Sequence, residues 1–396
     1  MEHDKITISI KRINKLLVIF VNSIRGGHLN RNFVDRVLQK KWPLSKIEKY
    51  VGNVTDAWLT YSTDEEIQQK AASGGTITGL LLHLLETGEI DGTLVCASYV
   101  ECKEVKTRYL IAKNRADLLK SQDSKYIDTD FAHEAIPLIK QFKGKLALVL
   151  LPCDLALITR LTQNDEDLNT KIVFKISLFC GHVSSPELTK LIVRKIKPAG
   201  TSLIDFRYRS GHWRGNIVAT FENGKTIEKP SSYFKDYQNL YFFCARKCLH
   251  CADQTGYTSD ISVGDVWLFS MKDNPIKHNA LLIRTPAGKD LISNALESES
   301  IAGKQVPIDV VCDAQSHSLL IHHNVTARKL AGKLFKMNIA DPVNDKVRLI
   351  DFLVALVVIS NYRLSNSNQG WKIISKLPKQ VVKGYLYFLR ALELLQ

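Results

Sequence analysis

Short apolar runs separated by amphipathic stretches make up much of the first half of the chain. Apolar residues recur at helical spacing over residues 76–87, where four leucines fall on one face. Continuous apolar runs at 93–98, 146–151 and 171–179 have the length and composition of buried strands. Strands that alternate with helices predict an α/β fold with a mainly parallel sheet and flanking helices.

The pattern changes after residue 200. Residues 205–209 and 215–221 alternate like antiparallel strands, a Cys-rich run follows, and the chain ends in helical patterns with a polar break at 365–370. The fold prediction therefore adds a smaller antiparallel β and Cys-rich portion and a helical C-terminal extension. The expected portions are a basic N-terminal segment (1–50), an α/β portion (51–200), a β-rich portion with the Cys-rich segment (201–320) and a basic helical extension (321–396).

Positive charge is concentrated at the two ends. The formal net charge is +14, yet residues 1–50 hold 11 Lys and Arg against 4 Asp and Glu, and residues 321–396 hold 12 against 4. Residues 51–320 are balanced at 31 against 32. A terminal excess without a basic and aromatic stacking platform argues against nucleic-acid binding.

The ends also carry apolar runs, at 16–21 and 352–359, and both are far shorter than the roughly 20 residues of a spanning helix. Basic residues beside apolar ones are typical of a segment on an anionic membrane surface or an acidic partner. A solvated basic face around a buried element gives the same pattern.

The overall composition, 45% hydrophobic and 24% charged, is that of an ordinary globular protein. The N-terminal residues do not resemble a secretory signal, because the apolar stretch is interrupted by lysine and arginine. We therefore expect a cytoplasmic protein, peripheral at the inner face of the membrane if its basic ends bind there. In that compartment the eight cysteines favour metal binding over disulfides.

Five cysteines are placed for one shared site. Cys248 and Cys251 form a C-x2-C pair with Cys244 shortly before it, and Cys153 and Cys180 each follow an apolar run. Ligands gather beyond the carboxyl ends of parallel strands, so the two strand-end thiols and the C-x2-C pair would close a four-thiolate site, with Cys244 as a neighbour or substitute. Four thiolates suit an iron-sulfur cluster or a zinc ion, and the spacing leaves both open.

Two weaker signals concern anions and flavins. The run Ser73-Gly74-Gly75-Thr76 opens a predicted helix, where free N-H groups attract phosphate, although a plain cap and turn has the same sequence. Ser124-Lys125-Tyr126 offers a hydroxyl, a cation and an aromatic ring, which is adequate for a nucleotide or flavin.

These motifs, taken in order, resemble the coenzyme F420 hydrogenase/dehydrogenase beta subunit family over roughly residues 51 to 300. The ordered set is far more specific than any of its members. It comprises Asp64-Glu-Glu-Ile67 to Ala72-Ser-Gly-Gly75, Ile90-Asp-Gly92, Ser124-Lys-Tyr126, Leu151-Pro-Cys153, Leu178-Phe-Cys-Gly-His182, Cys248-x2-Cys251 and Ser259-Asp-Ile-Ser-Val-Gly-Asp265.

The resemblance implies FAD and one 4Fe-4S cluster, and makes residues 51–200 the flavin-binding portion. It implies an oxidoreductase that passes electrons between an external donor, ferredoxin or coenzyme F420, and an organic substrate. The implied site residues are Ser73, Gly74, Gly75 and Thr76 at the flavin nucleotide's phosphates, Ser124, Lys125 and Tyr126 along the flavin, Asp260, Gly264 and Asp265 around the cofactor pocket, and Cys153, Cys180, Cys248 and Cys251 at the cluster.

Two features depart from the family pattern. The ferredoxin-like C-x2-C-x2-C module of many relatives is missing, since the first cysteine is Cys96. Asp123 and Leu150 stand where the family's Gly-Ser-Lys-Tyr and Gly-Leu-Pro-Cys motifs have glycine. The alternative interpretation is a non-catalytic, zinc-stabilised scaffold attached to a membrane or an acidic partner. The sequence assigns no catalytic residue and no substrate, and it allows a homo-oligomer.

Overall fold

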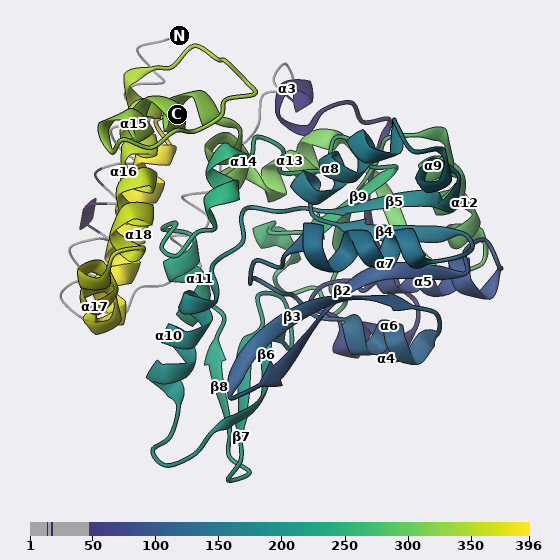
Figure 1. Cartoon of the computed structure of the whole chain (residues 1–396), viewed down its shortest axis with the longest axis horizontal. Coiled ribbons are helices and arrows are strands. Elements are labelled where there is room, and N and C mark those ends of the chain that lie inside the picture. Colours follow the sequence, from purple (N-terminus) through teal and green to yellow (C-terminus); the bar gives the residue numbers. More distant parts are fainter. Residues whose placement is uncertain (1–13, 15–16, 19–46) are drawn as a thin grey trace.

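A twisted sheet of eight strands forms the centre of the molecule (Figure 1). The computed structural model describes residues 14, 17–18 and 47–396, so the expected N-terminal segment lies almost entirely outside the described residues. The strand order is β11 (Ile301–Val306), β1 (Asp56–Ser62), β10 (Asn279–Ile283), β9 (Ile261–Asp265), β5 (Ile172–Leu178), β4 (Leu146–Leu150), β2 (Gly92–Glu101) and β3 (Glu104–Ala112).

The four central strands β9, β5, β4 and β2 run parallel, and antiparallel strands extend the sheet on both sides. This arrangement confirms the predicted α/β class. Strands from both sides of residue 200 contribute to the sheet, so the two middle portions expected from the sequence share it.

Helices cover both faces of the sheet, which explains the continuous apolar run of β4. Ala147 and Val149 pack with α5 (Thr76–Glu86) and α12 (Pro286–Glu297) on one face. Leu146, Leu148 and Leu150 pack on the other face, against α7 (Ile136–Gln141), α8 (Pro152–Thr162) and α9 (Glu166–Lys171). A strand that is buried on both faces is apolar at every position and does not alternate between apolar and polar residues.

A second sheet and the C-terminal helices enclose a separate core. The antiparallel strands β6 (Leu203–Ser210), β7 (Asn216–Phe221) and β8 (Thr226–Pro230) confirm the β-rich portion predicted after residue 200. The helices packed there are α10 (Pro186–Ile196), α11 (Ser232–Gln238), α15 (Val325–Leu334), α16 (Leu349–Ser365), α17 (Asn368–Lys376) and α18 (Lys379–Glu393). Figure 1 places α15 to α18 at one end of the molecule, beside α10 and α11.

The helical C-terminal extension is confirmed, with a break between α16 and α17 inside the predicted polar stretch. Among the described residues no single helix is long and apolar enough to cross a membrane. In the part of the chain that the structure describes, α16 and α17 meet that criterion only as a pair, and they are bent by 100° at the break. Further helical segments include α3 (Ile47–Val51), η2 (Phe131–Ala135), η4 (Phe269–Met271), α13 (Ile308–Ala314) and α14 (Ser316–His323).

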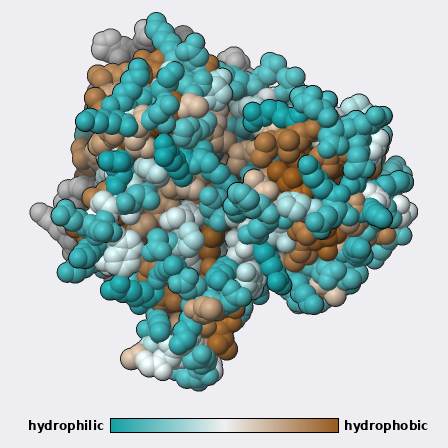
Figure 2. All heavy atoms as spheres, viewed as in Figure 1, coloured by the Kyte–Doolittle hydropathy of each residue, from teal (hydrophilic) through white to brown (hydrophobic). Residues whose placement is uncertain are grey.

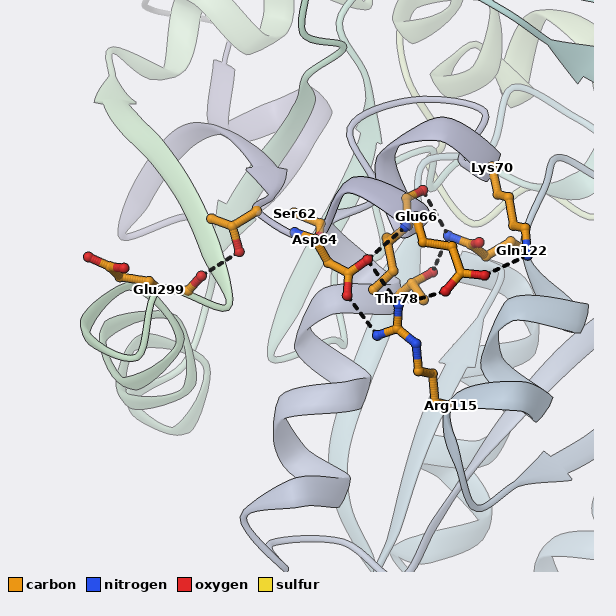
Figure 3. Close-up of polar contacts among 10 residues, drawn as sticks. Ser62, Asp64, Glu66, Lys70, Thr78, Arg115, Gln122 and Glu299 are labelled. Carbon is orange, nitrogen blue, oxygen red and sulfur yellow. Dashed lines mark hydrogen bonds and ion pairs between the residues drawn. The ribbon is translucent and has the colours of Figure 1, made fainter.

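An ion-pair network fixes the helices next to the Ser-Gly-Gly loop (Figure 3). Arg115, which begins α6 (Arg115–Ser121), donates to both oxygens of Asp64, at 2.6 and 3.0 Å, and to Glu66 at 2.8 Å. The bond from Arg115 lowers the pKa of Asp64, which also caps α4 (Glu65–Lys70). Gln122, just after α6, donates to the hydroxyl of Thr78 in α5, at 3.2 Å. The hydrogen bond from Gln122 therefore links the first turn of α5 to the end of α6.

The first amide of α5 is capped by a residue far along the chain. Asn279 Oδ1 accepts a hydrogen bond from the N-H of Thr76 at 3.2 Å, and its Nδ2 donates to the carbonyl of Gly264 at 3.1 Å. Asn279 is 8% exposed and belongs to β10. One side chain thus joins α5, β9 and β10 at the end of the sheet.

Replacing Asn279 by alanine should lower the free energy of unfolding by about 3 kcal/mol, because two buried backbone groups lose their partner. The change in the free energy of unfolding is measured by urea denaturation of the variant and of wild-type protein with the same metal content. The control is Asn114→Ala, which removes the exposed cap of α6 and should cost about 1 kcal/mol. Equal losses of stability in the two variants would show that the Asn279 side chain contributes no more than an exposed helix cap.

Candidate functional site

The carboxyl ends of two neighbouring parallel strands each lead to a cysteine. Cys153 lies in the first turn of α8 directly after β4, and Cys180 follows β5 by two residues. Because β4 and β5 are adjacent and parallel, the two thiols reach the same edge of the sheet.

Backbone hydrogen bonds at Ser184 bring the remaining cysteines to this edge. The N-H of Ser184 donates to the carbonyl of Tyr126 at 2.8 Å, and its carbonyl accepts from Asp128 at 2.9 Å. On the other side, Ser184 bridges to Cys244, and the N-H of Ala245 donates to the carbonyl of Val183 at 2.9 Å. Three distant segments are thereby paired, and the 3-10 turn η3 (Arg246–His250) carries the C-x2-C pair beside Cys180.

All four predicted cysteines line one cavity, with about 280 Å³ of empty space. The complete lining is Leu151, Pro152, Cys153, Cys180, Val183, Lys247, Cys248, Cys251, Asp253 and His322. Cys244 is buried behind Cys248 and is not part of the wall. The thiols do not converge on one point: within the described residues, no three or more His, Cys, Asp or Glu side chains are grouped to hold a metal ion.

Burial dominates the electrostatics of these thiols. It raises the pKa of Cys153 and Cys180 well above the usual range and that of Cys251 to about 12, and the neighbouring thiols add to the rise. The pKa of Cys248 is lowered instead, because Cys244 hydrogen-bonds to it. Three of the four groups are therefore neutral thiols at pH 7 in the metal-free protein, and a metal must displace their protons.

His322, which the sequence did not single out, completes the cavity wall. Its Nδ1 lies 2.7 Å from the carbonyl of Gly181, and its Nε2 lies 3.3 Å from Cys251 Sγ. The histidines adjacent to cysteines in the sequence lie elsewhere: His182 stacks on Tyr241 and His250 accepts from the N-H of Ala340. No local pattern signals His322, because it comes from α14, 71 residues after Cys251.

A second hollow, with about 310 Å³ of empty space, adjoins the end of β9. Ser73 and Asp265 both line it, together with Arg209, Trp267 and Lys277. Asp265 accepts two hydrogen bonds from Arg209, at 2.7 and 2.8 Å, and the guanidinium carbon of Arg209 lies 4.9 Å from the ring centre of Trp267.

The Ser-Gly-Gly-Thr run begins α5 as predicted, but part of it is committed to internal contacts. The hydroxyl of Thr76 lies 2.9 Å from that of Thr60, and its N-H is bonded to Asn279. Gly75 has a φ of +77°, and a Cβ at Gly74 would lie 2.7 Å from the carbonyl of Thr60. Ser73 remains at the hollow, where its hydroxyl donates to the carbonyl of His278.

The Ser-Lys-Tyr run connects this region with the Ser184 pairing. The buried ammonium of Lys125 donates to the carbonyls of Gln122 and Asp123 at 3.0 and 2.9 Å, so it caps the end of α6. The N-H of Ser124 donates to the carboxylate of Asp123 at 2.8 Å. The ring of Tyr126 packs on Phe234, and Lys235 Nζ lies 3.7 Å from its centre.

Sequence reasoning missed two cations that line the hollow, Arg209 and Lys277, and a third nearby, Arg207. Arg207 and Arg209 alternate along β6, and this two-residue spacing was the available signal. Lys277 Nζ donates to the carbonyl of Ala71, and burial together with Arg209 and Arg207 lowers its pKa to about 8. Arg207 also lines a larger hollow, with about 1000 Å³ of empty space, that includes Lys70, Lys120 and Asp123.

Two predicted pocket residues lie apart from these hollows. Asp260 precedes β9 and therefore sits at the opposite edge of the sheet, where it accepts from the N-H of Lys175 and the hydroxyl of Thr285, both at 2.8 Å. Gly264 is packed against Phe179, whose ring would lie 2.1 Å from an added Cβ. The structure brings together the four cysteines in one place and Ser73 with Asp265 in the other.

Hydrogen bonds connect the two places. Gln315 Nε2 donates to the carbonyl of Asp265 at 2.6 Å, and Gln254 Nε2 donates to Gln315 Oε1 at 3.1 Å. The carbonyl of Gln254 accepts from the N-H of Cys180 at 2.9 Å. A path of hydrogen bonds through Gln254 and Gln315 therefore connects the cysteine cavity with the charged hollow.

Comparison with known proteins gives sequence relatives and a structural neighbour. The chain is 31% identical over 232 residues to an uncharacterized protein of Methanocaldococcus jannaschii, covering 55% of this chain and 58% of that protein. It is 24% identical over 253 residues to the coenzyme F420 hydrogenase subunit beta of Methanosarcina barkeri, covering 63% of this chain and 81% of the subunit. It spans 41% of the coenzyme F420-dependent sulfite reductase of M. jannaschii, at 29% identity.

The fold is similar to a chain of the F420-reducing [NiFe] hydrogenase complex from M. barkeri, with a TM-score of 0.57 and 21% identity over 74% of this chain and 98% of that one. Two family models match in tandem. Residues 57–133 match the N-terminal part of the coenzyme F420 hydrogenase/dehydrogenase beta subunit, and residues 143–308 match its C-terminal part. Together these matches cover more than half of the chain, which therefore belongs to the coenzyme F420 hydrogenase/dehydrogenase beta subunit family.

Proposed function

We propose that this protein is an oxidoreductase that passes electrons between an external donor and an organic substrate through a 4Fe-4S cluster and FAD. The observation that carries the proposal is the convergence of Cys153, Cys180, Cys248 and Cys251 on one cavity. Relatives named as a hydrogenase subunit, a formate dehydrogenase subunit and a sulfite reductase, all F420-dependent, support the reaction class.

The donors around the cavity fit a cluster. Four soft thiols from three segments line its wall, and thiolates are the ligands of 4Fe-4S clusters. Four thiolates could also hold a single zinc ion, so the metal content of the purified protein decides between the two. A bound cluster would supply one-electron steps and a bound flavin two-electron steps.

We assign the pyrophosphate of the flavin dinucleotide to the charged hollow. Lys277 and Arg209 line it, and although Arg209 is paired with Asp265, the ammonium of Lys277 is a cation that suits a phosphate. Ser73, between Ala72 and the glycines, adds a polar contact at the rim. The backbone of Tyr126 and the end of β9 are linked by hydrogen bonds to the segments that carry the cysteines, so a flavin bound at this hollow would lie near the cluster site.

Coenzyme F420 and ferredoxin are the external donors that we propose. F420 appears in the names of several relatives, and F420 is an anionic deazaflavin that would need a cationic site. The larger hollow with Lys70, Lys120 and Arg207 offers such a site beside the flavin hollow. We further propose that the protein works with partner subunits, as the hydrogenase complex does.

Serine substitution of the cavity cysteines tests the cluster. Cys153→Ser, Cys180→Ser, Cys248→Ser and Cys251→Ser should each lower iron and sulfide content at least severalfold, because a cluster loses a ligand. Anaerobically purified protein, with iron, sulfide, zinc and flavin quantified, provides the measurement.

Cys312→Ser is the matched control, since Cys312 is buried but lies in another core cluster, and Cys244→Ser should retain the cluster. Stoichiometric zinc without flavin in the wild-type protein would instead establish the zinc-stabilised scaffold. If the Cys312 variant lost as much iron as the cavity variants, the four cavity cysteines could not be assigned as the ligands.

Flavin affinity should depend on pH through Lys277. Its pKa is about 8, and an adjacent phosphate would raise it in the complex. Affinity should therefore be constant below pH 8 and fall as pH rises above it, by up to tenfold per pH unit, until the pKa of the complex is reached. Fluorescence titration of FAD measures this. Lys277→Met should bind more weakly and lose this dependence, and a pH profile unchanged by the substitution would place the flavin phosphates elsewhere.

We also propose that the C-terminal helices contact an anionic membrane surface. Ile373 is 54% exposed on α17 between the exposed lysines Lys372 and Lys376, and Phe388 is 41% exposed on α18. Figure 2 shows apolar and hydrophilic side chains interleaved over these helices, at the left of the view. Apolar side chains flanked by cations are the chemistry that binds anionic interfaces.

The double substitution Ile373→Glu and Phe388→Glu should weaken flotation with phosphatidylserine vesicles at least tenfold, since each buried side chain is worth about 1.5–3 kcal/mol. Ile204→Glu is the control, because Ile204 is 51% exposed on β6, in the second sheet. Binding that is the same with neutral vesicles, or insensitive to salt, would contradict the electrostatic part.

A further inference from the structure

A buried arginine in the C-terminal extension holds the Cys-rich turn. Arg328 lies on α15 and is 2% exposed. Its Nε donates to the carbonyl of Leu249 at 3.0 Å, and its Nη2 donates to the carbonyls of Cys251 and His322 at 2.7 and 2.9 Å. Its Nη1 donates to the carbonyl of Ile321. One guanidinium thus joins the turn that carries Cys251 to the end of α14.

No carboxylate within residues 47–396 forms an ion pair with Arg328. Arg209, which is equally buried, is paired with Asp265. A buried charge without a counter-ion is costly, and carbonyl dipoles offset only part of that cost. The groups whose negative charge would interact most strongly with Arg328 are the hydroxyl of Tyr241 and the thiols of Cys251, Cys244 and Cys248.

The same extension reaches the cavity directly. His322 is part of its wall, with Nε2 at 3.3 Å from Cys251 Sγ. Both His322 and Arg328 lie beyond residue 308, where the family match ends. The cavity is therefore assembled from residues inside the family match and from residues outside it.

We propose that the C-terminal extension completes the metal site, with the Arg328 guanidinium acting as the counter-charge of the metal-bound cysteines. This inference rests on the proposed function. Four thiolates outweigh the positive charge of either a 4Fe-4S core or a zinc ion, so the occupied cavity is anionic. Arg328 is a positioning residue, since it acts through the turn and through its charge and does not touch the metal.

The charge has a consequence for reduction. When dithionite supplies one electron to the centre, the site becomes more negative and the nearby guanidinium stabilises the reduced form. Removing the guanidinium should therefore disfavour reduction, whereas a purely structural role would leave the potential of the surviving centres unchanged.

The test compares Arg328→Met, which removes the charge, with Arg328→Lys, which keeps it. Arg284→Met is the matched control: Arg284 is half-buried and also donates to backbone carbonyls, those of Val51, Asn53 and Thr255, but no cysteine is among the charges that affect it. The midpoint potential of the full-length, anaerobically purified protein is measured by a dithionite titration followed by electron paramagnetic resonance.

Arg328→Met should lower the equilibrium constant for one-electron reduction at least tenfold, which is about 59 mV toward negative potential. Arg328→Lys should remain near the wild-type value, and Arg284→Met should not change it. An unchanged potential in Arg328→Met would overturn the proposal. If Arg328→Met does not fold, loss of the centre in Arg328→Lys would overturn it too, because charge alone would then not suffice.

The failure of the proposed function can be told apart. If wild-type protein holds zinc, the oxidoreductase proposal fails. The counter-charge role of Arg328 is then tested by the rate at which the protein releases zinc to a chelator. Release at least tenfold faster in Arg328→Met, with no change in Arg284→Met, would support it, and equal rates would overturn it. Wild-type protein with neither metal would overturn both proposals.

Discussion

The backbone pairing at Ser184 is the constraint on which both sites depend. Ser184 is fully buried and joins the segment at Tyr126 to the segment at Cys244. Without it, the strand-end cysteines and the C-x2-C turn would belong to separate parts of the fold, because one pair lies on the sheet and the other beyond α11. These bonds are made by backbone groups, so no side-chain motif in the sequence signals them.

The two sites are electrostatically different although they are neighbours. The cysteine cavity has buried thiols that are neutral until a metal binds, next to a guanidinium and the Lys247 ammonium. At the hollow beside Asp265, burial and then the nearby cations Arg209 and Arg207 lower the pKa of Lys277. Both sites thus have cations close to the carboxyl ends of the parallel strands, where ligands bind in open α/β sheets.

Local patterns predicted what depends on local spacing. The strand-end positions of Cys153 and Cys180 followed from apolar runs, and their meeting with the C-x2-C pair followed from the parallel sheet. The ligand roles themselves stay a prediction. Patterns could not predict the partners of Thr76, because its cap, Asn279, lies 203 residues away and is chosen by strand pairing.

The same limit explains His322, which no spacing rule connects with a cysteine. Gly264 illustrates a second limit. It is packed closely against Phe179, and a sequence pattern cannot distinguish such a glycine from one that borders an open pocket.

The position of Arg328 late in the chain has a consequence for biosynthesis. Chains leave the ribosome from the N-terminus, so Cys153 and Cys180 emerge long before the turn with Cys251, and Arg328 emerges later still. A metal centre delivered to the nascent chain would find an open wall and no counter-charge. If the cavity holds a metal centre, its wall is complete only after His322 and Arg328 have been synthesised.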